Sequence, residues 1–397
     1  MTIATYERNI SDSTDQIERD AGDWVSARSE GPRAGMHHRL PGFIQPFLTW
    51  LTARPAPGET AKSHSSHYHV VTAFAALVAG VVFSLAALEL SGLWLIALPF
   101  MMIVSASGMG KLQAVVFHHC AHGTVFQERS TNRRVGETIS ILLLMKHFDV
   151  YQHEHMLHHS PNKLLTHEDE FTQFVMNLAG LRPGLPKAML WRRVLISFVS
   201  PFFHLRFLLA RISSCLLSHS TVHNLIGWAA WGGLLYVAWL TETLIEVAVV
   251  WLFPVVILLQ IGTALRTLCE HRFPEQEVIQ ARGKTFVCLA TAGVFPGAAV
   301  PEQSAATPGG LVAWAGWWTA MLTVHLFARV FVLVGDAPCH DFHHRRPASR
   351  RWTDYIHARQ KDADSGCPTY PLGYIETWGL FEAIDENLAS LSTASRI

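Results

Sequence analysis

The amino-acid sequence predicts an all-α protein, folded as a multi-pass bundle of transmembrane helices. Half of its 397 residues are hydrophobic and only 16% are charged, whereas about a quarter of the residues of a typical soluble protein are charged. Uncharged apolar runs recur along the chain, and each is about long enough to cross a hydrocarbon core of roughly 30 Å. We therefore expect lipid to surround much of the folded chain.

Four of these runs pair into two hairpins, and they cover residues 70–88, 93–110, 225–240 and 244–265. Two further runs, 285–300 and 310–328, form a third hairpin if both cross the bilayer. The first of these is short and contains Pro296. The sequence thus predicts four to six spans.

Basic residues predict the orientation of the hairpins. No Lys or Arg lies within either of the first two hairpins, whereas Lys111 and Arg266 follow the ends of the second and fourth runs. Cytoplasmic loops carry the excess of positive charge in membrane proteins. We therefore expect both termini and the region 111–223 to lie in the cytoplasm.

The chain is expected to comprise a cytoplasmic, partly disordered N-terminal segment (1–68), a membrane domain (69–347) and a cytoplasmic C-terminal segment (348–397). The first apolar run begins only near Val70, so we expect no cleaved signal peptide. We expect a bacterial inner membrane, rather than the endoplasmic reticulum, to hold the protein. The net charge is zero, which gives no reason to expect nucleic-acid binding.

Histidine is the residue in excess, with 23 copies, and many of them fall into three clusters. The clusters are His118-x-x-x-His122, His155-x-x-His158-His159 and His340-x-x-His343-His344. On a helix, residues at i, i+3 and i+4 share one face. Each cluster therefore presents its imidazoles in one direction, as a shared metal centre requires. Asp336 is expected to cap the helix that carries the third cluster.

Chance does not account for these clusters. With this many histidines, an H-x-x-x-H match is expected about once per chain, but an H-x-x-H-H match only roughly 0.08 times. Two of the latter are present. Eight histidines exceed the four ligands of a structural zinc ion, so two metal ions fit the count. All-imidazole sites suit iron, zinc, copper and nickel alike, so the ligand type alone does not select the metal.

The three clusters, in this order, resemble the histidine boxes of the integral-membrane fatty acid desaturase superfamily. The similarity extends over about residues 70–347, although His119 stands where that family's first box more often has an acid. The resemblance implies that the bundle carries a cytoplasmic helical cap with a di-iron site, ligated by the eight box histidines. It also implies that the protein uses O₂ to oxidise a C–H bond.

The resemblance implies a ninth ligand, His271, which follows the fourth span. Helical geometry turns His119 and His153 away from the faces of their clusters, and we expect them to lie behind the ligands. Glu154, Glu270 and Asp341 are candidates to accept the ring N–H groups of ligating imidazoles, as carboxylates commonly do around metals. We expect no catalytic residue other than these ligands.

An electron donor must come from outside, because the six cysteines contain no C-x-x-C pair for an iron–sulfur cluster. The resemblance implies a partner such as a ferredoxin, a rubredoxin or cytochrome b5. The basic residues Arg345, Arg346, Arg350 and Arg351 are a candidate docking patch for an acidic carrier. Membrane lipid and an acyl-chain substrate are the other expected partners.

A fatty-acyl desaturase, which introduces a C=C bond, is the leading hypothesis. A hydroxylase, a ketolase or an acetylenase uses the same kind of centre, and the boxes do not separate these activities. A histidine-rich metal transporter is the alternative from another class. Transporters place their ligands near the bilayer midplane on broken helices, whereas these clusters lie just beyond the predicted spans.

Overall fold

The computed structural model describes residues 31–178 and 180–394, and helices make up nearly all of the regular structure in that part of the chain. Two three-residue strands, β1 (Gly293–Phe295) and β2 (Glu376–Trp378), pair in parallel. The predicted all-α membrane fold is therefore confirmed. Disorder was expected within residues 1–68, and residues 1–30 lie outside the described residues. The remainder of that segment contains helices α2 (Pro32–Arg39) and α3 (Gln45–Thr52).

Four continuous helices are long and apolar enough to cross a membrane. They are α4 (Ser66–Leu90), α5 with its continuation (Leu98–Ala121), α13 with α14 (Leu244–Glu270) and α17 with its continuation (Pro308–Val332). The predicted runs 70–88 and 244–265 lie within the first and third of these. The run 93–110 begins earlier than its helix, because residues 92–96 form a separate 3₁₀ turn.

The remaining predicted span, 225–240, lies in α12 (Thr221–Leu240). This helix is not among the four, because its tryptophans, glycines and N-terminal polar residues lower its apolarity. Its outward side chains are nevertheless apolar, as at Leu225 and Val237. Before it, α10 (Lys187–Val199) and α11 (Pro201–Leu216) meet at a bend of 74°, and they count as a fifth span only if the bent pair crosses as one.

The predicted run 285–300 does not form a span. Its helix, α16, covers only Gly283–Ala290, and the chain then enters β1 and turns at Pro296 and Gly297. Eight residues of helix rise about 12 Å, far less than the roughly 30 Å of a hydrocarbon core. Phe286 and Phe295 are fully buried inside the protein. This apolar run is therefore core, and it does not provide the additional span that a third hairpin would need.

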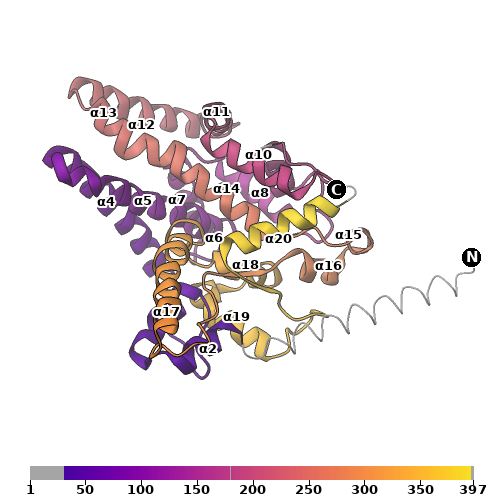
Figure 1. Ribbon diagram of the computed structural model, residues 1–397. Helices are drawn as coiled ribbons and strands as arrows, with labels where there is room; N and C mark the ends of the chain where they lie inside the picture. Colours follow the sequence, from indigo (N-terminus) through magenta and orange to yellow (C-terminus); the bar gives the residue numbers. More distant parts are fainter. Residues whose placement is uncertain (1–30, 179, 395–397) are drawn as a thin grey trace, which may run out of the picture.

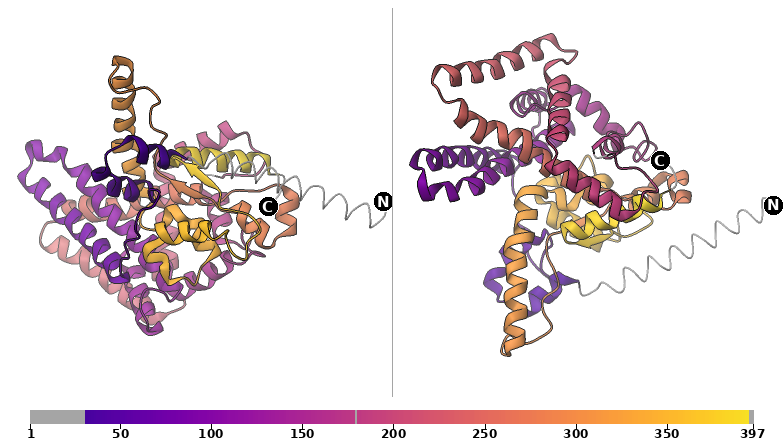
Figure 2. Two further views of the ribbon diagram at one scale, coloured as in Figure 1. Left: turned by 90° about the horizontal axis from the view of Figure 1, so that it is seen from below. Right: turned by 45° about the horizontal axis from the view of Figure 1, so that its top comes forward.

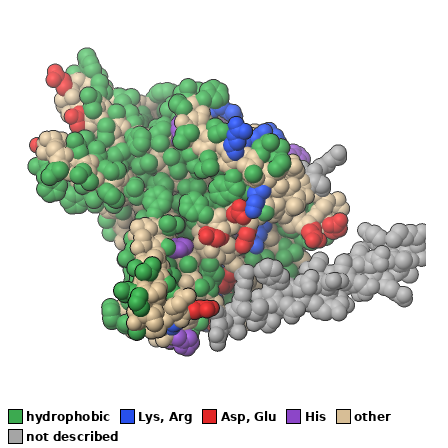
Figure 3. Space-filling view, in the orientation of Figure 1, with side chains coloured by type: hydrophobic (Ala, Val, Ile, Leu, Met, Phe, Trp, Pro, Cys, Tyr) green, Lys and Arg blue, Asp and Glu red, His purple; other side chains and the backbone are tan. Residues whose placement is uncertain are grey.

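The long helices leave the core in two directions. The hairpin α4–α5 and the hairpin formed by α12 and α13 (Leu244–Val247) extend the same way, whereas α17 (Pro308–Ala320) projects away from both (Figure 1, Figure 2). Hydrophobic side chains cover the surface of the two hairpins, and most of the charged side chains lie over the opposite end (Figure 3). This division is typical of a protein with one end in lipid and the other in water.

Several shorter helices, together with the last segments α6 and α14 of two of the long helices, form the end of the molecule opposite the hairpin tips (Figure 1). They are α6 (His118–Ala121), α7 (Arg129–Leu142), α8 (Phe148–His158), α9 (Glu170–Leu178), α14 (Leu259–Glu270), α15 (Gln276–Ala281), α18 (His340–Arg345), α19 (Tyr355–Asp364) and α20 (Leu380–Thr393). One buried hydrophobic cluster joins α14 to α20 and to β1 through residues such as Leu268, Leu388 and Val294. The C-terminal segment is thus packed onto the end of a membrane span.

Two glycines let α4 and α5 approach closely. A Cβ atom at Gly80 would collide with the backbone of Ser105, and one at Gly108 would collide with the backbone of Leu77. Membrane helices commonly pack through such small residues, because no hydrophobic force drives them together in lipid. The contact holds α5, which continues into the first histidine box, against its neighbour.

We expect the Gly80→Ala protein to lose about 1–3 kcal/mol of stability, as overpacked cores typically do. Thermal unfolding of the purified protein in detergent measures this as a lower Tm. Gly316→Ala on α17 is the matched control, since nothing lies within 4 Å of a Cβ atom at that position. Equal Tm values for the two variants would contradict the packing argument.

Candidate metal centre

The first histidine box lies at the end of the long helix that begins at Leu98. A π-helical segment, Leu112–Phe117, precedes it, and α6 then carries His118, with His122 at the C-terminal cap. A π-helical turn inserts a residue and so rotates the residues after it, and such turns often occur at functional sites. His118 and His122 therefore point inward from a helix that begins in the apolar end of the molecule.

The second box lies on α8, a short helix in which His155 and His158 are buried on one face, with His159 at the C-terminal cap. His147 caps the N-terminus of α8, where its Nδ1 atom accepts the backbone N–H of Asp149 at 3.3 Å. His271 is the first residue after α14 and is 1% exposed. A backbone bridge to Thr291 fixes its extended conformation.

The third box occupies α18, and all three of its histidines are buried. The predicted capping role of Asp336 is wrong, because its side chain makes no cap hydrogen bond. Instead, Asp336 Oδ2 lies 2.7 Å from Nε2 of His119. The helix begins after a 3₁₀ turn, Ala337–Cys339, in which proline occupies an early position.

The structure brings all nine predicted ligands together, in two groups. The first group contains His118, His122, His155, His159 and His343, and the second contains His158, His271, His340 and His344. Within each group, one nitrogen per residue lies within 4.8 Å of all the others. Each H-x-x-H-H box divides between the groups, so the two groups share their helices and lie side by side.

The converging atoms are Nε2 nitrogens, and their separations fit ligands around one ion. His118 and His343 approach to 2.7 Å, His122 and His155 to 2.9 Å. In the second group, the Nε2 atom of His271 is 3.1 Å from that of His158 and 3.2 Å from that of His340. Ligands held about 2.1 Å from a metal at angles of 90–109° are about 3.0–3.4 Å apart. The distances in the second group lie within this range, and those in the first group are up to 0.3 Å shorter. The donor set therefore fits two metal ions.

Burial keeps these imidazoles neutral. It lowers the pKa of His122 to about 3 and that of His271 to about 3. The pKa values of His155, His340 and His344 also fall well below the ordinary value, because burial and the neighbouring histidines both disfavour the charged form. A metal binds the unprotonated ring nitrogen, so these groups are ready for ligation at neutral pH.

A sequence model of the fatty acid desaturase family matches residues 93–377, which is most of the chain. The chain belongs to the fatty acid desaturase family. The predicted resemblance is confirmed, and membership makes the protein an oxidoreductase of the fatty acid desaturase type. This family typically uses iron, and the two histidine groups suit a metal. A comparison with individual curated proteins finds no match.

Asp169 orients one histidine of the desaturase site. Its Oδ1 atom accepts the Nδ1–H of His158 at 2.8 Å, and its carboxylate also accepts the backbone N–H groups of Leu165 and Phe171. Burial opposes ionisation, but His158 and the backbone donors together lower the pKa of Asp169. A fixed carboxylate at Nδ1 leaves Nε2 of His158 free for the metal.

His119 has a similar arrangement outside the two groups. It is fully buried, bonds to Asp336 and stacks on the indole of Trp352, with ring centroids 4.2 Å apart. It therefore lies behind the box histidines, next to His343. His153, in contrast to the prediction, is exposed on the other side of α8 and belongs to neither group.

The predicted carboxylate partners of the imidazoles are largely different from those observed. Glu154 pairs with Lys146, and Asp341 is buried in a bidentate ion pair with Arg359, so neither holds a histidine. Glu270 lies near His340, but its oxygen is 4.0 Å from Nδ1, beyond hydrogen-bonding distance. The predictions for Glu154 and Asp341 are wrong. Both acids lie next to box histidines in sequence, but in the fold each pairs with a basic residue, Lys146 or Arg359.

The acids that do contact the histidines, Asp169 and Asp336, were missed as partners. Asp169 follows the second box by ten residues and lies in a turn, and no residue spacing indicates its contact with His158. Its only sequence signal is its position directly before α9, where a capping acid is common. The structure alone reveals that this cap faces the metal centre.

A cavity of about 160 Å³ adjoins both histidine groups, with His118, His155 and His340 in its wall. A second cavity, of about 590 Å³, shares Gln113, Tyr151, Glu170, Phe174 and Thr263 with the first. The outer cavity extends between α9 and the bent pair α10–α11, and its wall includes Phe203, Phe207 and Arg206. The two cavities therefore adjoin, and together they extend from the histidines to the bent pair α10–α11.

We expect Asp169→Asn to weaken metal binding about 10–100-fold, the usual effect of losing a carboxylate behind a ligating histidine. Titration of the purified protein with Fe²⁺ under anaerobic conditions measures the change. Glu168→Gln is the matched control, because the neighbouring Glu168 is exposed and pairs only with Lys163 in the described structure. Equal loss of affinity in both variants would show that the contact with His158 is not responsible.

Proposed function

We propose that the protein is a di-iron fatty-acyl desaturase and that the nine histidines hold its two iron ions. The convergence of nine Nε2 atoms into groups of five and four supports this proposal most strongly. Family membership supports iron as the metal. Bound there, the iron pair supplies O₂-dependent oxidation of an unactivated C–H bond, chemistry that no side chain performs.

The protein's own task is to place one methylene group beside the centre and to exclude water. The inner cavity supports this role, because Phe171, Phe174 and Ala337 share its wall with the histidines. A site that excludes water keeps a reactive centre from side reactions. Positioning of the reacting carbon then decides which bond is attacked.

The two connected cavities suit a substrate with an apolar chain and a polar end. Phe174 and Thr263 lie where the cavities meet, and the outer one has both phenylalanines and polar groups in its wall. Lys146 and Glu170 form an ion pair of 2.7 Å beside this junction. We propose that the chain reaches inward past the junction, while the head group stays near Arg206 in the wall of the outer cavity.

The alternative reactions require the same positioning of the substrate chain beside the iron ions. A hydroxylase, a ketolase and an acetylenase differ from a desaturase in the chemistry after the first C–H oxidation, and the products separate them. A desaturase removes two hydrogens from the chain, whereas a hydroxylase adds an oxygen atom. Metal transport receives no support, because the histidines lie buried at the ends of the spans in an enzyme family.

The electron donor is proposed to be a separate carrier protein. Only part of the predicted basic patch is available to it. Arg345 is 3% exposed and donates to the carbonyls of Leu372 and Gly373, and Arg346 is bound to Asp362. Arg350 and Arg351 remain exposed, and they are the part of the patch that still supports docking of an acidic partner.

We expect His155→Ala to abolish product formation, because it removes one of five nitrogens from the first group. The measurement is mass spectrometry of the acyl chains of cells that express each variant. His153→Ala is the matched control, since His153 lies on the same helix but is exposed. Normal product from the His155→Ala protein would exclude the proposed centre. A gain of oxygen in place of a loss of two hydrogens would assign the hydroxylase reaction.

We expect Thr263→Phe to reduce turnover about 100-fold, the scale of effect that misplacement of a substrate can have. The larger side chain would fill the junction of the two cavities, while the iron content should remain that of the unaltered protein. Thr319→Phe, at an exposed position of α17, is the control. Unchanged turnover and chain preference in Thr263→Phe would show that the substrate takes another path.

A further inference from the structure

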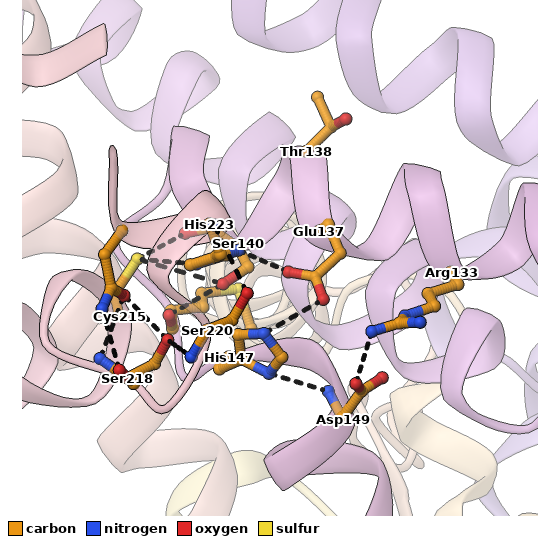
Figure 4. Close-up of polar contacts among 12 residues, drawn as sticks. Arg133, Glu137, Thr138, Ser140, His147, Asp149, Cys215, Ser218, Ser220 and His223 are labelled. Atoms are coloured by element: carbon orange, nitrogen blue, oxygen red, sulfur yellow. Dashed lines mark hydrogen bonds and ion pairs between the residues drawn. The ribbon is translucent and has the colours of Figure 1, made fainter. Parts of the chain in front are cut away.

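A second cluster of metal-ligand residues lies at the opposite end of α8 from the histidine boxes. It contains Glu137 on α7, His147 at the N-terminal cap of α8 and His223 in the first turn of α12 (Figure 4). His147 and His155 are eight residues apart, which corresponds to about 12 Å along a helix. The cluster is therefore separate from the proposed iron centre.

The three side chains converge. Glu137 Oε2 lies 2.5 Å from Nδ1 of His223, and Oε1 lies 3.4 Å from Nε2 of His147. One donor atom of each residue lies within 4.8 Å of both others. The side chains of His147 and His223 are 1% and 4% exposed. Oε2 of Glu137 is itself buried, yet no hydrogen bond is directed at it despite the short contact.

The second ring nitrogen of His223 also has a neighbour. Nε2 of His223 faces Sγ of Cys215 at 3.8 Å, and the single thiol hydrogen is directed at the carbonyl of Ser140, 3.5 Å away. With the ring hydrogen on Nε2, directed at this sulfur, Nδ1 would direct its lone pair at the carboxylate. A nitrogen and a carboxylate oxygen only 2.5 Å apart repel each other unless a proton or a metal ion lies between them.

The arrangement of the donors favours a metal ion over a shared proton. A proton bridges one pair of atoms along a hydrogen bond, whereas here two imidazoles and a carboxylate surround one point. This is the His₂Glu donor set with which zinc is bound in several enzymes. His147 accepts the Asp149 backbone N–H through Nδ1. Metal binding at Nε2 requires the ring hydrogen on Nδ1, so this hydrogen bond would be given up on binding. Ligand atoms of Asp149 and His219 lie within 4.8 Å of a ring nitrogen of His147 and are candidate replacement partners.

We propose that Glu137, His147 and His223 form a zinc site that fixes the beginning of α8. The ion joins α7, α8 and α12, and thereby ties the helix of the second histidine box to the membrane hairpin. The site is structural, and it leaves the fourth position of a tetrahedral zinc ion for water or His219. Its existence does not depend on the identity of the reaction at the iron centre.

Zinc and iron per chain, measured by elemental analysis of the full-length protein purified after growth with both metals, test the proposal. Glu137→Gln should contain about one zinc ion fewer than the unaltered protein, with the same iron content. Thr138→Ala is the control, because Thr138 is next to Glu137 but points away from the cluster (Figure 4). Equal zinc in Glu137→Gln and the unaltered protein, or no zinc in either, would overturn the proposal.

If Glu137→Gln loses iron as well as zinc, the variant has misfolded. A variant that gains a new spectroscopic signal then provides an independent test. His223→Cys replaces an imidazole with a thiolate, which also binds zinc and cobalt. After loading with Co²⁺, this variant should show a thiolate-to-cobalt absorption band that the unaltered protein lacks. The band supports the site, and its absence from a cobalt-loaded, iron-containing His223→Cys protein overturns it.

Discussion

The structure depends on nine histidine side chains that bring their Nε2 atoms together inside the protein. Burial disfavours the charged form of most of these rings, as the low pKa values of His122 and His271 show. At His158 burial acts in the same direction, but the Asp169 carboxylate outweighs it and raises the pKa. Unprotonated nitrogens only about 3 Å apart repel one another, and metal ions bound between them would remove this repulsion. The scaffold must therefore hold the rings against their own repulsion and position them for metal ions.

Rigid partners around the rings meet this requirement. Asp169 holds His158 and is itself fixed by backbone N–H groups, and Asp336 holds His119 behind the first box. Asp341 acts one step further away, because its ion pair with Arg359 anchors α18 to α19. Each acid thus fixes a helix or a ring without occupying a metal position itself.

The membrane hairpins contribute the other constraint. Close packing at Gly80 and Gly108 fixes α5, and the continuous helix then carries His118 out of the apolar region. At the far end of α8, Glu137, His147 and His223 connect the second box to α12. The metal centre is thereby held between two membrane hairpins, and the cavities beside it open toward the bent pair α10–α11.

The sequence by itself determined the features that are local. Box spacing places each cluster of imidazoles on one helical face, and uncharged runs predict helices in lipid, because both follow from the period of a helix and the cost of burying charge. It also predicted His271 through its resemblance to a family. It did not distinguish the buried core run 285–300 from a span, because both are apolar.

Only the tertiary structure decided which residues meet across long separations. It divided His158 and His159 between two groups, and it assigned Asp169, not Glu154, to a ring nitrogen. Glu154 was the nearer acid in sequence, but Lys146 lies beside it in the fold. A residue's neighbours in a packed interior come from distant segments, and sequence spacing along one helix carries no information about them.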